Sequence, residues 1–70
     1  MNKEILIFYF EYLDNIRKSG IANMFGASDL LEEEFDLSRK EAKEIVILWM
    51  STFSSVMTVE QRVDWALSID

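Results

Sequence analysis

The residues best suited to chemistry gather at residues 28–43, where a run of carboxylates is followed by basic side chains. The carboxylates are Glu32, Glu33, Glu34 and Asp36, and paired carboxylates can act as general acid and base. Consecutive positions on a helix point about 100° apart, so these side chains diverge instead of converging on one substrate. The run also lacks the ligand spacing of a calcium loop. We therefore expect neither an acid–base pair nor a calcium site here.

Other catalytic chemistries lack their usual residues. The chain has no His and no Cys, which removes the common base of a nucleophile–base pair, the commonest zinc ligand and any thiolate. Its two glycines, Gly20 and Gly26, are isolated, so there is no glycine-rich phosphate loop. We expect a protein that is not an enzyme, with no catalytic residues, no metal site and no cofactor.

Size and charge narrow the class of protein further. Seventy residues make one domain, residues 1–70, and half of them are apolar, so we expect self-association to cover part of the apolar surface. The formal net charge of −6 disfavours a general affinity for nucleic acid or for membranes. No apolar run approaches the roughly 18 residues of a membrane span. The sequence predicts a soluble, cytoplasmic protein.

Periodicity predicts an all-α fold, a compact bundle of about four helices of which the second is short. Ser38 with Glu41, and Thr58 with Gln61, match the capping box that opens a helix. A connector is expected at residues 21–27. The expected helices cover about residues 3–18, 29–35, 38–53 and 58–68.

The apolar arc of the first expected helix, which Leu6 and Phe10 widen, is broader than a single neighbouring helix can cover. In the first helix the residues expected to face the core are Ile5, Phe8, Tyr9, Tyr12, Leu13 and Ile16. In the third helix the corresponding residues are Ala42, Ile45, Val46, Trp49, Met50 and Phe53. The expected centre of the core consists of Trp49, Phe53, Phe8 and Tyr12.

Four apolar residues lie away from the main stripes and predict a contact surface: Ile7, Phe10, Ile47 and Leu48. A contiguous exposed apolar patch marks an interface, and a self-complementary patch closes as a dimer across a two-fold axis. We therefore expect a homodimer that uses these residues as its self-association surface. The alternative is that the last helix and the connector cover both flanks within one chain.

The corner between the second and third helices fits a helix-turn-helix, with Ser28 as the expected cap and Asp36 as the turn residue. The residues at the packing positions of such a corner are Leu31, Phe35, Leu37, Ala42 and Ile45. Arg39, Lys40 and Lys43 would stand where a recognition helix meets base edges. The neighbouring acidic residues would repel phosphates, so we favour a purely structural corner. Nucleic-acid binding, and mimicry of DNA by the acidic patch, remain the alternatives.

Residues 19–53, which read "SGIANMFGASDLLEEEFDLSRKEAKEIVILWMSTF", contain the succession NMFGA, L-x-E-E-F, E-A and W-M. This succession resembles small uncharacterised proteins of bacteriophage and marine viral genomes, in which a Gly often follows E-E-F where this chain has Asp36. The resemblance covers about half of the chain. It implies a phage-like origin and no chemistry. Taken together, the sequence predicts a small phage-type accessory protein in the cytoplasm of a host cell that acts by protein–protein binding, with a host or viral protein as a further candidate partner.

Overall fold

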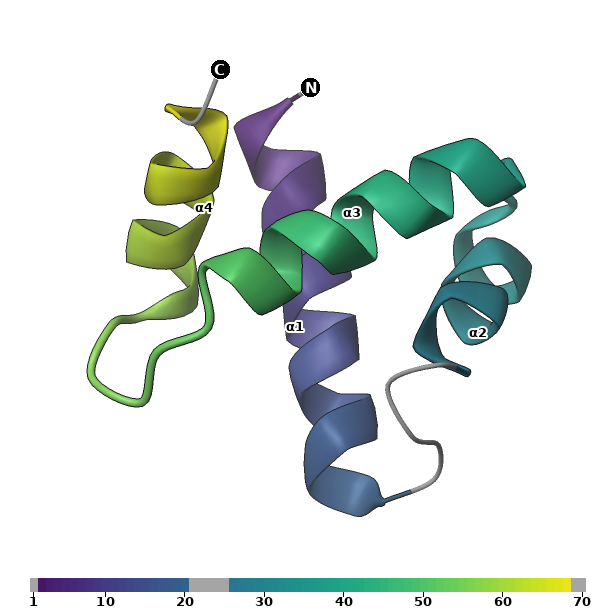
Figure 1. The fold of residues 1–70 in the computed structure, drawn as a ribbon, viewed down its shortest axis with the longest axis horizontal. Helices are drawn as coiled ribbons and strands as arrows, with labels where there is room; N and C mark the ends of the chain where they lie inside the picture. Colours follow the sequence, from purple (N-terminus) through teal and green to yellow (C-terminus); the bar gives the residue numbers. More distant parts are fainter. Residues whose placement is uncertain (1, 21–25, 69–70) are drawn as a thin grey trace.

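The computed structural model describes residues 2–20 and 26–68, and in this part of the chain four helices form an all-α bundle (Figure 1). The helices are α1 (Lys3–Ser19), α2 (Ala27–Phe35), α3 (Arg39–Ser51) and α4 (Val59–Leu67). The fold class and the short second helix are as predicted. Most of the connector expected at residues 21–27 lies outside the described residues.

Local capping chemistry sets most of the helix ends. The Asn2 side chain accepts the backbone N–H of Glu4 at 2.8 Å, and Gly20 ends α1 in the left-handed region at φ 68°. The hydroxyls of Ser38 and Thr58 cap α3 and α4, as the capping boxes predict.

The start of α2 differs from the expectation. The helix begins at Ala27, after Gly26, which has no side-chain cap, so Ser28 is not the N-cap. At the other end of α2, Asp36 adopts the left-handed conformation at φ 53° and ψ 47°. Asp tolerates this region better than most non-glycine residues, because its short polar side chain can hydrogen-bond locally. The tight turn therefore forms without a glycine.

The four helices are arranged around the pair α1 and α3. α1 and α4 run antiparallel and bring the two chain ends to the same side of the molecule, while α3 crosses in front of α1 (Figure 1). α2 packs on the first half of α3 and on α1. α2 and α4 do not touch each other, so the core lies between α1 and α3 and is closed on either side by the two short helices.

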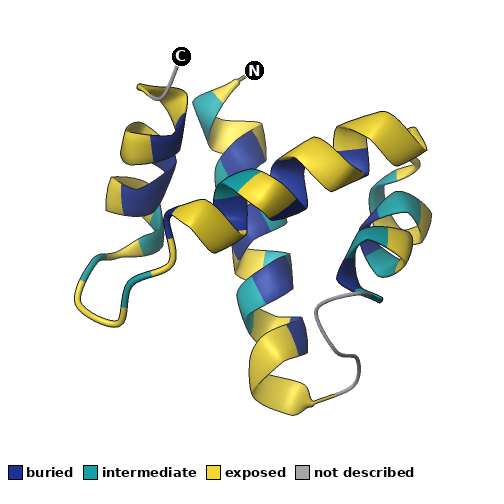
Figure 2. Cartoon of the chain, viewed as in Figure 1, coloured by how far each residue is buried: buried dark blue, intermediate teal, exposed yellow. Residues whose placement is uncertain are grey.

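The buried face of α1 is not the predicted one. Leu6 and Phe10 are fully buried, whereas Ile5 and Phe8 are 46% and 63% exposed. Figure 2 shows that buried and exposed positions alternate along α1. The apolar arc of this helix is so wide that its periodicity fits more than one buried face. The packing of α4 along the Leu6–Phe10 side selects the observed face, so only Leu13 and Ile16 of the expected stripe are buried.

The centre of the core is therefore corrected as well. Trp49 is buried, as predicted, and Tyr12 is half-buried, but Phe53 is 41% exposed. Met50, which was expected in the core stripe of the third helix, is 50% exposed. The buried members of α3 are Ala42, Ile45, Val46 and Trp49, and they meet Leu6, Phe10 and Leu13 of α1, Ala27 and Leu31 of α2, and Val63 and Ala66 of α4 in one cluster.

Candidate functional site

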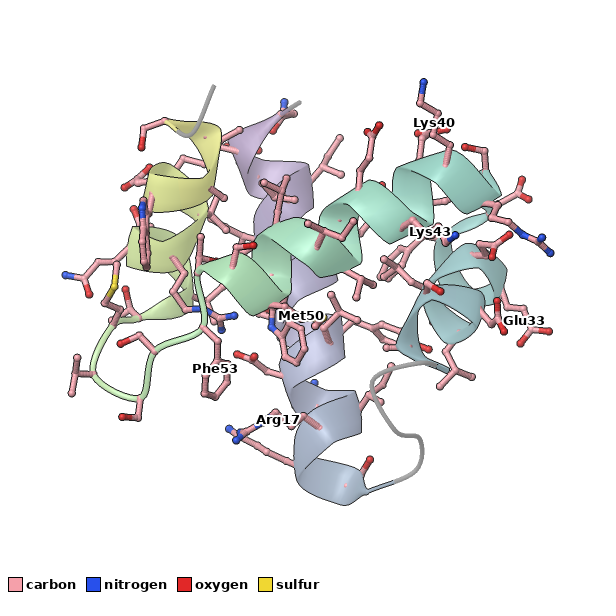
Figure 3. The ribbon with its side chains drawn as sticks, viewed as in Figure 1. Arg17, Glu33, Lys40, Lys43, Met50 and Phe53 are labelled. Atoms are coloured by element: carbon pink, nitrogen blue, oxygen red, sulfur yellow. The ribbon has the colours of Figure 1, made fainter. Side chains whose placement is uncertain are left out.

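The solvent-facing side of α3 combines exposed apolar and basic side chains. Lys40, Lys43, Ile47 and Met50, which we call the α3 outer face, are spaced so that they share one side of the helix. Ile47 is 60% exposed and Met50 50% exposed. Figure 3 shows where Lys40, Lys43 and Met50 lie along α3, and all three are exposed. Among the described residues neither lysine forms an ion pair, because the three ion pairs of this part of the chain use Lys3 and Arg62.

The structure does not bring the four predicted self-association residues together on one surface. Phe10 is fully buried, so its assignment to an exposed contact surface is wrong. Ile7 and Leu48 are half-buried against the core, and Ile47 alone is exposed. Leu48 and Ile47 line a shallow hollow of about 280 Å³ with Glu44. The physical reason is that α1 is oriented about its own axis differently from the prediction. In the observed orientation Phe10 faces α4 and the interior.

The observed orientation of α1 also exposes a second surface, on the side of this helix opposite its buried residues. Phe8 is 63% exposed, and the exposed residues Glu4 and Glu11 stand one turn before and after it on the same side of the helix. We call these three residues the α1 outer face. α3 crosses in front of α1 (Figure 1), and the buried residues of both helices face the core between them. The α1 outer face and the α3 outer face lie opposite those buried positions, so they are on different sides of the molecule.

The predicted helix-turn-helix corner is present as a packing arrangement. Its residues Leu31, Ala42 and Ile45 are buried, and α2 packs directly on α3. The candidate nucleic-acid contacts Arg39, Lys40 and Lys43 are all exposed, as expected. The lining of a hollow of about 410 Å³ consists of Arg39, Asp29, Glu32 and Glu33, so acidic side chains surround this arginine.

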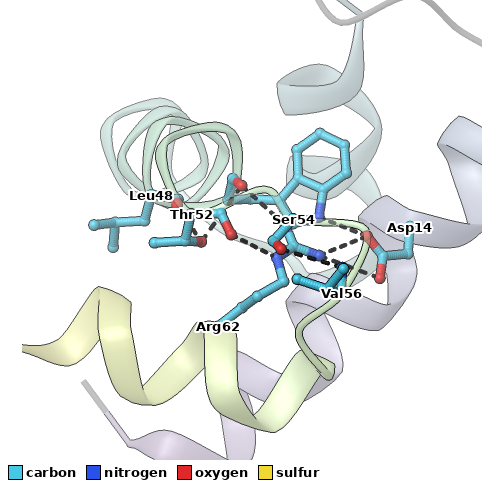
Figure 4. A network of polar contacts seen from close by, with 7 residues as sticks. Asp14, Leu48, Thr52, Ser54, Val56 and Arg62 are labelled. Atoms are coloured by element: carbon cyan, nitrogen blue, oxygen red, sulfur yellow. Dashed lines mark hydrogen bonds and ion pairs between the residues drawn. The ribbon is translucent and has the colours of Figure 1, made fainter.

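A buried polar network, which sequence reasoning missed, ties the helices together (Figure 4). Arg62 of α4 is only 2% exposed, and its Nη1 donates to the Asp14 carboxylate at 3.0 Å. Its Nε and Nη2 donate to the carbonyl oxygens of Thr52 and Trp49, at 3.0 and 2.9 Å. The indole Nε1 of Trp49 donates to the same Asp14 oxygen at 2.8 Å.

This network closes the C-terminal end of α3 in place of a glycine cap, because Arg62 satisfies the carbonyl groups of Trp49 in the last turn and of Thr52 at the C-cap. The sequence does contain an indication of this network. Arg62 occupies a position in the apolar stripe of its helix, three residues after Val59 and four before Ala66. A charged residue in such a stripe is buried only when it is paired, so it predicts a buried partner.

Two tyrosines of α1 close the α2 side of the core. The rings of Tyr9 and Tyr12 meet the edge or face of the Phe35 ring, with centroids 4.8 and 5.3 Å away. Burial, and then the negative charges of Glu34 and Glu33, raise the pKa of the Tyr12 phenol above its usual value. This group is therefore neutral at physiological pH and serves packing, with a long hydrogen bond of 3.4 Å to the Leu30 carbonyl.

No known protein family, curated protein or solved structure matches the chain. Within residues 2–20 and 26–68, no group of three or more carboxylates is placed to hold a metal ion. No helix in the described part of the chain has the length and apolar character needed to cross a membrane. The fold and surfaces define a small all-α domain, and two contrasting helix faces are among its exposed features.

Proposed function

We propose that this protein is a non-catalytic protein-binding module that associates with further copies of itself through the α3 outer face. The observation that supports the proposal is the exposure of Ile47 and Met50, neighbours on one helix, next to two preceding lysines, Lys40 and Lys43, that form no ion pair with described residues. Adjacent exposed apolar side chains that a polar rim surrounds are typical of a protein contact surface.

The α1 outer face has the complementary composition. It places Phe8 between Glu4 and Glu11, where the α3 outer face places Ile47 and Met50 beside lysines. Contact between the two faces would bury apolar side chains against each other and pair ammonium groups with carboxylates. Because the faces differ, the contact is heterologous. Because they lie on different sides of the molecule, each copy offers both, and copies add head to tail instead of closing across a two-fold axis.

A contact of this kind is expected to be weak. One helix laid on another buries less than the about 1,000 Å² that a stable interface needs, so association belongs to the transient class. The lysine–glutamate pairs at its rim are exposed, and added salt should weaken the contact further. Association is therefore expected only at high protein concentration and low ionic strength.

The experiment is sedimentation equilibrium with two blocked variants. I47Q/M50Q removes the apolar centre of the α3 outer face, and F8Q removes that of the α1 outer face; all three positions are exposed, so the fold should survive, which circular dichroism checks. We expect the wild-type mass to rise with concentration past the dimer, and each variant alone to stay at the monomer mass of 8.2 kDa. An equimolar mixture of the variants should form dimers and nothing larger.

Two results would contradict this reasoning. If F8Q dimerises on its own while I47Q/M50Q stays monomeric, the contact is a symmetric one between two α3 outer faces, and the head-to-tail arrangement is wrong. If the wild-type protein is a monomer at every concentration, self-association is wrong altogether. The resemblance to phage proteins would then direct the α3 outer face toward a host or viral protein.

Nucleic-acid recognition is the second candidate, and one observation favours it. Arg39, Lys40 and Lys43 are exposed at the start of α3, and none of them forms an ion pair with a described residue. This hypothesis predicts salt-dependent binding of duplex or single strands that Lys43→Glu abolishes. The absence of a mobility shift at low salt would refute it. Acidic mimicry of DNA, carried by the acids at residues 29–36, predicts instead that the protein displaces DNA from a basic partner.

A further inference from the structure

A hollow of about 300 Å³ opens between the last turn of α1 and the segment that links α3 to α4. Among the residues that line it are Asp14, Arg17, Lys18, Phe53, Ser54 and Arg62, and we call it the Arg17 hollow. It lies apart from both outer faces described above. Its volume is at the lower end of the range, about 300–1,000 Å³, that small-molecule sites occupy.

The side chains around the Arg17 hollow carry three positive charges and one negative charge, in a protein whose net charge is −6. The single carboxylate, Asp14, is already engaged by Arg62 and by the Trp49 indole. Neither Arg17 nor Lys18 forms an ion pair with a described residue. The hollow therefore has an excess of positive charge that the fold itself does not neutralise.

Phe53 holds two of these cations in place. The Cζ atom of Arg17 lies 4.2 Å from the centroid of the Phe53 ring, and that of Arg62 lies 5.2 Å from it. A guanidinium over an aromatic face is attracted to the ring electrons. Figure 3 shows Arg17 and Phe53 next to each other at this side of the molecule. Arg17 is thus positioned by a contact within the protein, although its own side chain is exposed.

Hydroxyl groups complete the lining. The Ser54 oxygen accepts the backbone N–H of Val56 at 3.2 Å, which leaves its O–H free to donate toward a ligand. Ser55 also lines the hollow. Guanidinium, ammonium and hydroxyl donors without an acceptor of their own are the groups that bind oxyanions, and the planar guanidinium can hold two oxygens of one carboxylate or phosphate at once.

We infer that the Arg17 hollow binds a small oxyanion, a phosphate or carboxylate group, through Arg17, Lys18 and the Ser54 hydroxyl, with Phe53 positioning Arg17. A simpler structural role would be that Arg17 and Lys18 stand in the last turn of α1 because cations are favourable at a helix C-terminus. That role requires no bound ligand and no selectivity between anions, so a binding measurement separates the two.

The test is an NMR titration of the full chain, with inorganic phosphate in one series and acetate in another, against chloride at equal ionic strength. We expect saturable shifts of the amide signals of residues 17, 18 and 53–55 with at least one oxyanion and none with chloride. The two series identify whether phosphate or carboxylate is the preferred group. R17Q/K18Q should lower the affinity at least tenfold.

A matched control removes the same charge elsewhere. K40Q/K43Q takes two positive charges from the α3 outer face and should leave the affinity within twofold of the wild type. Thermal unfolding of both variants checks that each is folded. The inference is overturned if neither oxyanion gives saturable shifts, or if both double variants weaken binding equally, since the latter means attraction to overall charge. It does not depend on self-association, and dilute protein keeps the two questions separate.

Discussion

The substitution Asp14→Ala tests the buried network most directly. It removes the single carboxylate beside Arg62, whose side chain is 3% exposed, and it removes the acceptor of the Trp49 indole N–H. Arg62 would keep the carbonyl oxygens of Trp49 and Thr52, but its charge would be left inside the protein without a counter-charge. Removing one partner of a buried ion pair costs about 3–5 kcal/mol.

That cost is comparable to the whole stability of the domain, since a single core of this size supplies about 3–5 kcal/mol. We therefore expect Asp14→Ala to be largely unfolded at 25 °C. Asp14→Asn also removes the counter-charge, but its amide oxygen can still accept from both Trp49 and Arg62. Its cost should therefore be lower than that of Asp14→Ala, at about 1.5–3 kcal/mol. Urea denaturation measures the free energy of unfolding of both variants. Far-ultraviolet circular dichroism is the signal to follow, because each substitution also perturbs the fluorescence of Trp49.

Two comparisons make the result interpretable. Asp64→Ala removes a carboxylate from the ion pair with Lys3, which is exposed, and should change stability little. The double variant D14L/R62M leaves no buried charge, so its cost should fall below the sum of the two single costs by more than about 1 kcal/mol. If Asp14→Ala lowers stability by less than about 1 kcal/mol, the cation reaches water and the network is not what holds α4 to α3.

Three further outcomes follow from particular residues. Asp36→Gly should raise stability by about 0.5–1 kcal/mol, a gain of several degrees in Tm, because glycine adopts the left-handed turn without strain, and Asp36→Ala should lower it. Phe10→Ala should lower the free energy of unfolding by about 3–5 kcal/mol, and Phe8→Ala should lower it far less, because Phe10 is buried and Phe8 is exposed. Equal losses would mean that α1 buries a different face. The raised pKa of Tyr12 means that the folded state keeps a proton that the unfolded state releases, so stability should fall above pH 10, and less steeply in Tyr12→Phe.

The parts of the fold that the sequence predicts correctly depend on residues close together in the chain. Ser38 and Thr58 cap their helices as predicted: Thr58 and Gln61 form the full capping box, while the Ser38 hydroxyl accepts from the Glu41 N–H and donates to the Glu41 carboxylate. The spacing of apolar residues likewise predicts four helices and the corner between α2 and α3. These are local interactions, so neighbouring residue types are sufficient to identify them.

The sequence alone does not predict which face of α1 is buried, because that choice depends on the helices packed against it. Ile5, Leu6, Phe8 and Phe10 are all apolar, and the pattern alone offers two faces of similar quality. The choice between them is made by α4, which lies more than 40 residues further along the chain and forms the Lys3–Asp64 contact at 2.9 Å. The predicted self-association surface contained Phe10 for this reason. The surface that replaces it, with Phe8 exposed, follows from the same orientation of α1.

The buried arginine shows a different limit. The position of Arg62 in an apolar stripe predicts that it has a buried partner, but thirteen acidic residues are available in the sequence. Asp14, the observed partner, is 48 positions away, and nothing in its neighbourhood along the chain distinguishes it. Pairing of this kind depends on how α1 and α4 pack, so it becomes visible only when the helices are placed.

The distribution of basic residues separates structural from binding roles. All seven lie in the described part of the chain, and only Lys3 and Arg62 form ion pairs there. Cations at the end of α1 are favourable for the helix, whereas Arg39 and Lys40 stand at the start of α3, where the helix dipole disfavours positive charge. The helix dipole therefore gives no reason for basic residues at that place, although Arg39 has Asp29, Glu32 and Glu33 of α2 nearby. For Lys40, the head-to-tail contact proposed above would supply a reason, because it would place this lysine beside the acid-flanked Phe8 of another copy.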